Sequence, residues 1–117
     1  MQDCIFCKII LGQVLTNFLY EDEWVVAFDD LHPKAPTHVL VVTREHVESL
    51  VEAASDEALL GATLSAAHKV AEKLGLSARG YKVVINVGRE GGQVIDHLHL
   101  HLLGGWDRGS DPDKFRV

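Results

Sequence analysis

Leucine and histidine alternate near the end of the chain, in the run His97-Leu98-His99-Leu100-His101-Leu102. Successive side chains of a β-strand point to opposite faces, so this alternation predicts a strand with its leucines toward a core and its histidines in a row on the other face. A half-exposed strand that uses histidine merely as its polar residue is the alternative, but histidine is seldom chosen for that purpose. Because histidine can be a nucleophile, acid, base or metal ligand near neutral pH, the row predicts a site of chemistry.

The other hydrophobic positions predict one α+β domain with a five-stranded, mostly antiparallel sheet and two helices. A short helix over residues 4–11 ends at Gly12, and a long helix from Ser55 ends at Gly75. The long helix carries an apolar stripe at helical spacing, formed by Leu60, Leu64, Ala67, Ala71 and Leu74. The remaining four strands are expected at residues 17–20, 24–28, 38–43 and 81–87. Their hairpin connections favour an antiparallel sheet with the helices on one face.

The apolar arc of the long helix is wider than one small sheet can cover. Leu59, Ala66 and Val70 lie beyond the first stripe, and Gly61 and Ala62 permit a close approach of another surface. A second copy of the chain would cover the excess, and isologous pairing is the commonest solution. The sequence therefore predicts a two-fold homodimer.

Length, charge and hydropathy narrow the class further. The 117 residues are enough for one domain, 1–117, whose residues 105–117 are expected to be a tail that is mobile or in contact with a dimer partner. A net charge of −6 argues against a nucleic-acid partner. No apolar run approaches the roughly 20 residues of a membrane span, and the first residues lack the features of a signal peptide. We therefore expect a cytoplasmic protein with neither a membrane nor a nucleic acid as partner.

A glycine-rich segment lies directly before the histidines. Gly88, Gly91 and Gly92 permit positive φ and a close approach of the backbone, and consecutive N–H groups in such a turn can hold an anion. Alone, a glycine-rich turn between strands is usually only a hairpin connection. Its position before three histidines makes it a candidate phosphate loop.

The pattern His-φ-His-φ-His-φ-φ over residues 97–103 resembles the motif of the histidine-triad (HIT) superfamily. The resemblance extends to the start Cys-Ile-Phe-Cys-Lys-Ile-Ile, to Pro33-Lys34-Ala35-Pro36-Thr37-His38, and to the ending Leu103-Gly104-Gly105. It covers residues 4–105 and looks most like the Hint branch of histidine-triad nucleotide-binding proteins, which are purine nucleoside phosphoramidase-like. The resemblance implies a HIT-like fold, a homodimer, an AMP-type purine nucleotide ligand, and hydrolysis of the P–N bond of adenosine 5′-phosphoramidates to AMP and an amine. The alternatives are a dinucleoside polyphosphate hydrolase and a non-catalytic, zinc-stabilised nucleotide-binding or interaction module.

The resemblance also assigns catalytic roles. It implies that His99 is the nucleophile, which passes through a nucleotidyl-imidazole intermediate, and that His38 is a fourth histidine that supports it. His101 lies two residues further along the same face, where it can donate a hydrogen bond to the phosphate or the leaving group.

Nucleotide contacts are expected from three parts of the chain. The carboxylate of Asp30 can accept hydrogen bonds from both ribose hydroxyls. By resemblance, Asn86, Gly92 and Gln93 contact the phosphate region, whereas Val94 stands where some relatives carry a hydroxyl and cannot donate to the bridging atom. Four apolar residues resemble the slot for the base, although plain core is an equally good interpretation of them: Phe6, Ile9, Phe28 and Leu31.

Two cysteines raise the question of a metal. Cys4 and Cys7 form a C-x-x-C pair, which supplies half of a tetrahedral zinc site. The resemblance to zinc-bearing members adds His46 and His97, which completes a Cys2His2 set typical of structural zinc. A reduced, buried cysteine pair with His46 at the surface is the alternative.

Overall fold

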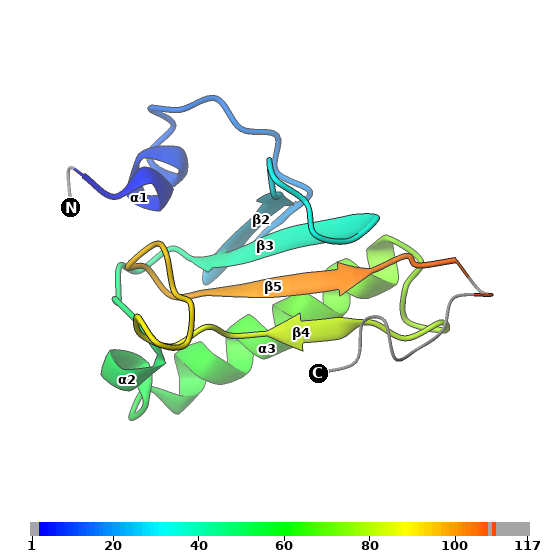
Figure 1. Cartoon of the computed structure of the whole chain (residues 1–117). Helices are drawn as coiled ribbons and strands as arrows, with labels where there is room; N and C mark the ends of the chain where they lie inside the picture. The colour runs from blue at the N-terminus through cyan, green and yellow to red at the C-terminus, as the bar shows by residue number, and fades with distance from the viewer. Residues whose placement is uncertain (1–2, 108, 110–117) are drawn as a thin grey trace.

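The computed structural model describes residues 3–107 and 109, and within them one antiparallel five-stranded sheet with the order β1-β2-β3-β5-β4. The strands are β1 (Tyr20–Glu21), β2 (Val25–Asp29), β3 (Thr37–Thr43), β4 (Lys82–Val84) and β5 (His99–Gly104). The helices are α1 (Ile5–Ile10), α2 (Leu50–Ala53) and α3 (Glu57–Lys73). The sequence expectation of a mostly antiparallel five-stranded sheet is confirmed, and β5 lies inside the sheet between β3 and β4 (Figure 1).

The two faces of the sheet have separate cores. On one face, α3 packs its alanines and Val70 against Val25, Val39 and Leu100. On the other face, Phe6 and Ile9 of α1 pack with a second set of strand residues, which alternate with the first: Val26, Phe28, Leu40 and Val42. Figure 1 shows α3 along one side of the sheet and α1 beyond the other. The expectation that the helices share one face is therefore wrong.

The described residues form three helices where the pattern predicted two. The added helix, α2, has only four residues, which is too short to show a helical period, and it is capped by Ser49, whose side chain accepts a hydrogen bond from the N–H of Val51. The long helix begins one residue later than expected, because Asp56 rather than Ser55 is its N-cap. It ends as expected, with Gly75 at φ 76° directly after the C-cap.

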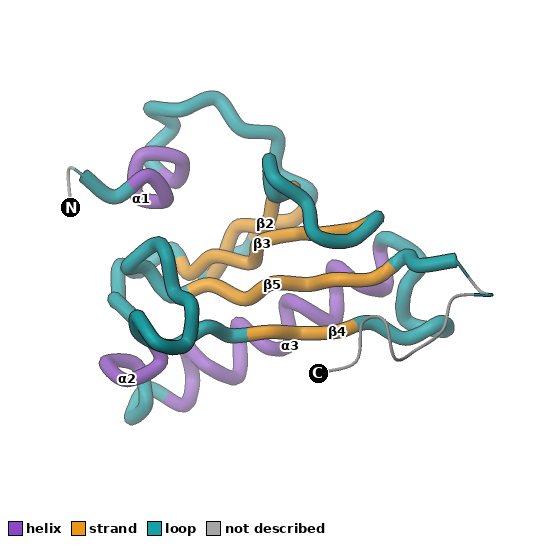
Figure 2. Tube along the Cα trace, in the orientation of Figure 1, coloured by secondary structure: helices purple, strands orange, loops and turns teal. Residues whose placement is uncertain are grey.

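Several expected strands are shorter in the structure. The predicted strand at 17–20 overlaps β1 (Tyr20–Glu21) only at Tyr20, and the predicted strand at 81–87 contributes only Lys82–Val84. His97 and Leu98 precede β5, which begins at His99. Figure 2 shows the long connections that result, one after α1 and one between β4 and β5.

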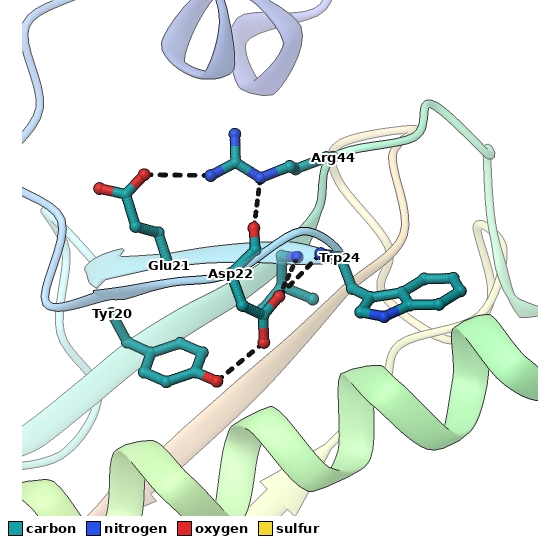
Figure 3. Close-up of polar contacts among 6 residues, drawn as sticks. Tyr20, Glu21, Asp22, Trp24 and Arg44 are labelled. Atoms are coloured by element: carbon teal, nitrogen blue, oxygen red, sulfur yellow. Dashed lines mark hydrogen bonds and ion pairs between the residues drawn. The ribbon is translucent and has the colours of Figure 1, made fainter.

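The turn between β1 and β2 is held by the carboxylate of Asp22. Its oxygens accept hydrogen bonds from the N–H groups of Trp24 and Val25 and from the hydroxyl of Tyr20, at 2.7, 2.9 and 2.8 Å (Figure 3). Arg44 donates to the carbonyl oxygen of Asp22 at 2.6 Å and pairs with Glu21 at 3.0 Å. A carboxylate that accepts from the backbone two residues ahead is a usual way to fix a tight turn.

Of the tail expected at 105–117, residues 108 and 110–117 lie outside the described residues. Among the helices of the described part of the chain, none is long and apolar enough to cross a membrane.

Candidate active site and metal cluster

The expected alternation on β5 is present, with one refinement. Leu100 and Leu102 point into the α3 core, and Leu98 packs with Leu59 and Ala53. His99 and His101 lie on the opposite face and line a cavity of about 630 Å³. His97 is fully buried and its ring belongs to a different cluster, so the row of three histidines serves two sites.

Hydrogen bonding fixes which nitrogen of His99 is free. Nδ1 of His99 lies 2.6 Å from the backbone carbonyl oxygen of His97. A carbonyl can only accept, so Nδ1 carries the proton and Nε2 carries the lone pair. Burial lowers the pKa of His99, which keeps the ring neutral near pH 7. The ring therefore has the tautomer that a nitrogen nucleophile needs.

His38 and His101 form a directed pair. The backbone N–H of Lys34 donates to Nδ1 of His38 at 3.0 Å, so the proton of His38 lies on Nε2. That Nε2 is 2.9 Å from Nδ1 of His101 and 3.4 Å from a carboxylate oxygen of Asp30. Nδ1 of His101 is thereby an acceptor, and its proton lies on Nε2. Burial, together with the nearby His99 and His38, lowers the pKa of His101 to about 4.

The cavity brings together eight of the residues expected at the nucleotide site: Phe6, Asp30, His38, Asn86, Gly92, Val94, His99 and His101. Of the four residues expected to form the base slot, Phe6 alone is among its lining residues. Ile9 and Phe28 are buried in the core beneath α1, and Leu31 is 89% exposed on the loop after β2.

The glycine segment forms a loop whose conformation is fixed by a side-chain hydrogen bond and by its glycines. The side-chain amide of Asn86 donates to the carbonyl oxygen of Gly91 at 2.8 Å. Gly88 and Gly92 have φ of 69° and 82°, and a Cβ at Gly91 would lie 2.3 Å from the carbonyl oxygen of Val87. Glycine is therefore required at Gly91 by space and favoured at the other two by backbone conformation.

Gln93 braces this loop. Its Oε1 accepts from the N–H of Gly88 at 2.9 Å, and its Nε2 donates to the carbonyl oxygens of Glu48 and Ile95 at 2.6 and 3.0 Å. The amide of Gln93 is thus engaged with the backbone, and Gln93 is not among the residues that line the cavity. The expected contact of Gln93 with a phosphate is therefore replaced by a position behind the glycine loop.

Sequence reasoning missed several residues of the cavity. Lys34 and His32 come from the loop between β2 and β3, and Lys82, Val84 and Leu103 come from β4 and β5. The register places Lys82 opposite Leu103 and Val84 opposite His101, so these side chains share the histidine face. The proximity of Lys34 to His38 was the one available signal, whereas the β4 residues could be found only once strand pairing was known.

The four residues expected to bind zinc converge. Sγ of Cys4 lies 3.2 Å from Nδ1 of His97, Sγ of Cys7 lies 3.2 Å from Nδ1 of His46, and the two Nδ1 atoms are 3.1 Å apart. All four donor atoms lie within 4.8 Å of one another. A tetrahedral zinc with bonds of about 2.0–2.3 Å holds its ligand atoms about 3.3–3.8 Å apart, so the donor set fits this metal closely.

The surroundings of the cluster also suit a cation. Nε2 of His97 donates to the carbonyl oxygen of Thr43 at 2.7 Å, which leaves Nδ1 with the lone pair facing the cysteines. Burial lowers the pKa of His97 and, together with Cys4, raises the pKa of the Cys7 thiol. A bound cation would favour the thiolate form of Cys7, because it neutralises the charge that burial disfavours.

The fold and the site together define a histidine-triad protein. The family model for the HIT domain matches residues 12–107, and the chain belongs to the HIT family. It is similar to an uncharacterised HIT-like protein of Synechococcus elongatus, with 44% identity over 105 residues, 89% of this chain and 91% of the relative. It is 37% identical to the purine nucleoside phosphoramidase of Escherichia coli over 89% of this chain and 88% of that enzyme.

Solved structures agree with this assignment. A HIT family hydrolase from Clostridium thermocellum has a TM-score of 0.86 and 43% identity, and the match covers 95% of this chain and 97% of that one. The histidine-triad nucleotide-binding protein of Candida albicans has a TM-score of 0.79 and 34% identity, covering 96% of this chain and 89% of that chain.

Proposed function

We propose that this protein hydrolyses adenosine 5′-phosphoramidates to AMP and an amine, with His99 as the nucleophile. The observation that carries the proposal is the hydrogen bond from Nδ1 of His99 to the carbonyl oxygen of His97. It leaves an unprotonated Nε2 on a buried, neutral imidazole that lines a cavity. The similarity to a relative named purine nucleoside phosphoramidase supports the P–N bond as the target.

In the first step, the Nε2 lone pair of His99 attacks phosphorus, a P–N(His) bond forms, and the bond to the leaving nitrogen breaks. The leaving nitrogen must take up a proton as it departs, because an amide anion is a very poor leaving group. His101, whose pKa burial lowers to about 4, is neutral near pH 7, so its Nε2–H donates a hydrogen bond to the departing nitrogen, which takes its proton from water. His38 holds this tautomer of His101 through its own Nε2. Covalent catalysis of this kind divides one difficult displacement into two easier ones.

In the second step, water attacks the phosphorus of the nucleotidyl-imidazole, and His99 leaves as a neutral ring. Over both steps, water supplies hydroxide to phosphorus and a proton to the amine. The N–H of His101 is one donor available for the phosphate oxygens. In the glycine loop the N–H groups of Gly88 and Gly92 already donate to Gln93 and to the carbonyl oxygen of Arg89, so further donors would come from the other N–H groups of the loop. Val94 offers no side-chain donor beside them, so leaving-group stabilisation relies on His101 and the backbone.

At the nucleoside end, Asp30 is the candidate partner of the ribose hydroxyls. One of its oxygens accepts from the N–H of His32 at 2.8 Å, which fixes the carboxylate at the cavity wall and leaves lone pairs on both oxygens. Phe6 supplies an apolar ring to the same cavity for the base. We further propose that Cys4, Cys7, His46 and His97 hold a structural zinc, and that the protein acts in the cytoplasm as a homodimer.

A panel of substrates tests the reaction. Purified protein is incubated with an adenosine 5′-phosphoramidate and, separately, with diadenosine triphosphate, and the products are separated by chromatography. The proposal expects faster release of AMP from the phosphoramidate. Lys34 and Lys82 at the cavity give positive charge that would suit a second and third phosphate, so dinucleoside polyphosphate cleavage is the second candidate. Preference for diadenosine triphosphate would establish that candidate, and nucleotide binding without turnover of either compound would establish a binding protein.

A further inference from the structure

His97 belongs to two sites at once. Its ring faces Cys4, Cys7 and His46, whereas its backbone carbonyl oxygen accepts the hydrogen bond that sets the tautomer of His99. Its other ring nitrogen is fixed by the carbonyl oxygen of Thr43 at 2.7 Å. The metal cluster and the candidate nucleophile are therefore joined through the covalent structure of one residue.

Phe6 makes a second connection between the same two sites. Its ring stands edge-on to His97 and to His99, with ring centroids 5.7 and 5.1 Å apart, and also to Phe28 at 5.8 Å. It is buried and lines the cavity. Phe6 lies between Cys4 and Cys7 in the sequence, so any tether on the two cysteines also fixes the position of its ring.

The helix that carries Phe6 has little stability of its own. α1 has six residues, and helices shorter than about 12–15 residues are marginal in water without tertiary support. The following segment, residues 11–19, contains no helix or strand and includes the fully exposed Leu15. Beyond the apolar contacts of Phe6 and Ile9, the thiols of Cys4 and Cys7 provide polar contacts to the rest of the fold.

We propose that the Cys2His2 cluster regulates the nucleotide cavity, in that metal binding and nucleotide binding both require α1 to be docked. A metal ion needs the two cysteines of docked α1, and a nucleotide needs the wall that Phe6 provides. Two ligands that bind the same docked state strengthen each other's binding even though they do not touch. This inference rests on the proposed nucleotide site and assigns a second role to a cluster that would otherwise be purely structural.

The first test measures AMP affinity by isothermal titration calorimetry, with zinc-loaded protein and with protein stripped by a chelator. Circular dichroism on both samples shows whether the sheet remains folded after stripping. We expect zinc to tighten AMP binding about tenfold, within the usual range of coupling between two sites. Equal affinity in the two folded samples would overturn the coupling, as would failure of the protein to take up zinc.

The reciprocal test needs no stable metal-free protein. A chromophoric chelator competes with the loaded protein for zinc, with and without saturating AMP. Linkage predicts that AMP raises the apparent zinc affinity of the protein about tenfold, so less zinc passes to the chelator. Identical release would contradict the proposal. If AMP fails to bind the zinc-loaded protein at all, the proposed nucleotide function fails, which is a different result from binding that ignores zinc.

A pair of variants on α1 separates the connection through Phe6 from general helix effects. Phe6→Leu keeps both cysteines and an apolar side chain but removes the aromatic contacts to His97 and His99, so zinc binding should persist while the effect of zinc on AMP affinity falls to less than half. Ile5→Ala changes a neighbouring side chain of the same helix that is 40% exposed, and it should leave the coupling unchanged. Equal coupling in Phe6→Leu and wild type would exclude Phe6 as the connection.

Discussion

The partners of each imidazole decide which nitrogen atoms can react. The carbonyl oxygen of His97 accepts a hydrogen bond from Nδ1–H of His99. The backbone N–H of Lys34 donates to His38, which in turn donates to His101. Backbone groups thus assign the tautomers of two rings directly and of a third through one intermediate. These assignments lead to two predictions at the scale of single residues.

The first prediction concerns His99. His99→Ala should lose turnover of an adenosine phosphoramidate by at least about a hundredfold, because water must then attack phosphorus without the covalent step. AMP should still bind, since Asp30 and the glycine loop remain. Mass spectrometry of quenched wild-type reactions should find one AMP unit on the peptide that contains His99.

His101→Ala serves as the comparison. It should react more slowly, by the roughly 10²–10³-fold typical of a lost hydrogen-bond donor to developing charge, yet still form the adduct on His99. Turnover by His99→Ala above about one hundredth of wild type would mean that His99 acts as a base on water.

The second prediction concerns pH and stability. An unfolded histidine titrates near pH 6.5, whereas burial lowers the pKa of His101 in the folded protein to about 4. Between these values the unfolded chain binds the extra proton, so the free energy of unfolding should fall as the pH drops from about 6.5 to 4. His101→Asn lacks this titration and should lose less stability over the same interval.

Urea unfolding of both proteins at several pH values measures the difference. The four residues of the Cys2His2 cluster are identical in the two proteins, so their protonation cancels when the curves are subtracted. Parallel curves between pH 4 and 6.5 would show that the burial of His101 does not shift its titration.

At the scale of elements, periodicity located the long helix but misjudged its buried face. Of the expected stripe, Ala67 and Ala71 are buried on the sheet, whereas Leu64 is 52% exposed and Leu74 is also exposed. The face on the sheet is built from Thr63, the alanines and Val70, because small side chains let a helix approach a sheet closely. Thr63 is tolerated there because its hydroxyl donates to the carbonyl oxygen of Leu59 at 2.7 Å. Sequence alone ranks leucine above alanine as a core residue, and that ranking fails where space is short.

The third prediction tests this reassigned face. Leu59 is 1% exposed and packs with Ala53 and Leu98, the leucine between His97 and His99. Leu59→Ala should lower the free energy of unfolding by about 2–5 kcal/mol, through lost burial and the cavity left behind. Val51→Ala on α2, at a site that is 68% exposed, is the control and should change it by less than about 0.5 kcal/mol. Chemical denaturation of the three proteins distinguishes them, and equal stability would place Leu59 outside the core.

At the scale of the whole molecule, the short edge strand β4 bears on the oligomeric state. β4 has three residues, pairs only with β5 among the described strands, and carries half-buried side chains. An unpaired strand edge is a surface that natural proteins usually cover. The residues from which the sequence predicted a homodimer, Leu59, Ala66 and Val70, are buried within the single chain and need no partner, so that reason for a dimer is wrong. The unpaired edge of β4 is the remaining reason to propose one.

The fourth prediction is therefore a particle mass near twice 12.9 kDa by light scattering at micromolar concentration. Leu64→Lys, on the exposed side of α3, should shift the mass toward that of one chain without changing the circular dichroism spectrum. Asp3→Lys, a change of charge at the exposed N-terminal end, is the control and should leave the mass unchanged. A mass near 13 kDa for the wild type would refute the dimer.

The sequence predicted the residues of the Cys2His2 cluster more completely than those of the cavity. The spacing of the histidines was enough to predict β5 and its two faces, and the resemblance placed Cys4, Cys7, His46 and His97 in one cluster, as the structure has them. The base slot was less accessible, since Ile9, Phe28 and Leu31 have the same apolar character whether they line a cavity or pack in a core. Lys82 and Val84 were out of reach, because their place opposite Leu103 and His101 depends on which strand pairs with β5.

The central position of β5 has a consequence for motion. β5 is paired on both sides, with β3 and β4, so its amides should exchange with deuterium only through the largest opening events of the fold, whereas the amides of residues 88–92 should exchange much sooner. Hydrogen exchange read by mass spectrometry would reveal this contrast, and similar rates in the two segments would contradict it. His99, anchored to the slowest-opening strand, would keep its position while the glycine loop beside it rearranges, so the candidate nucleophile and the candidate phosphate loop would move on timescales that differ by orders of magnitude.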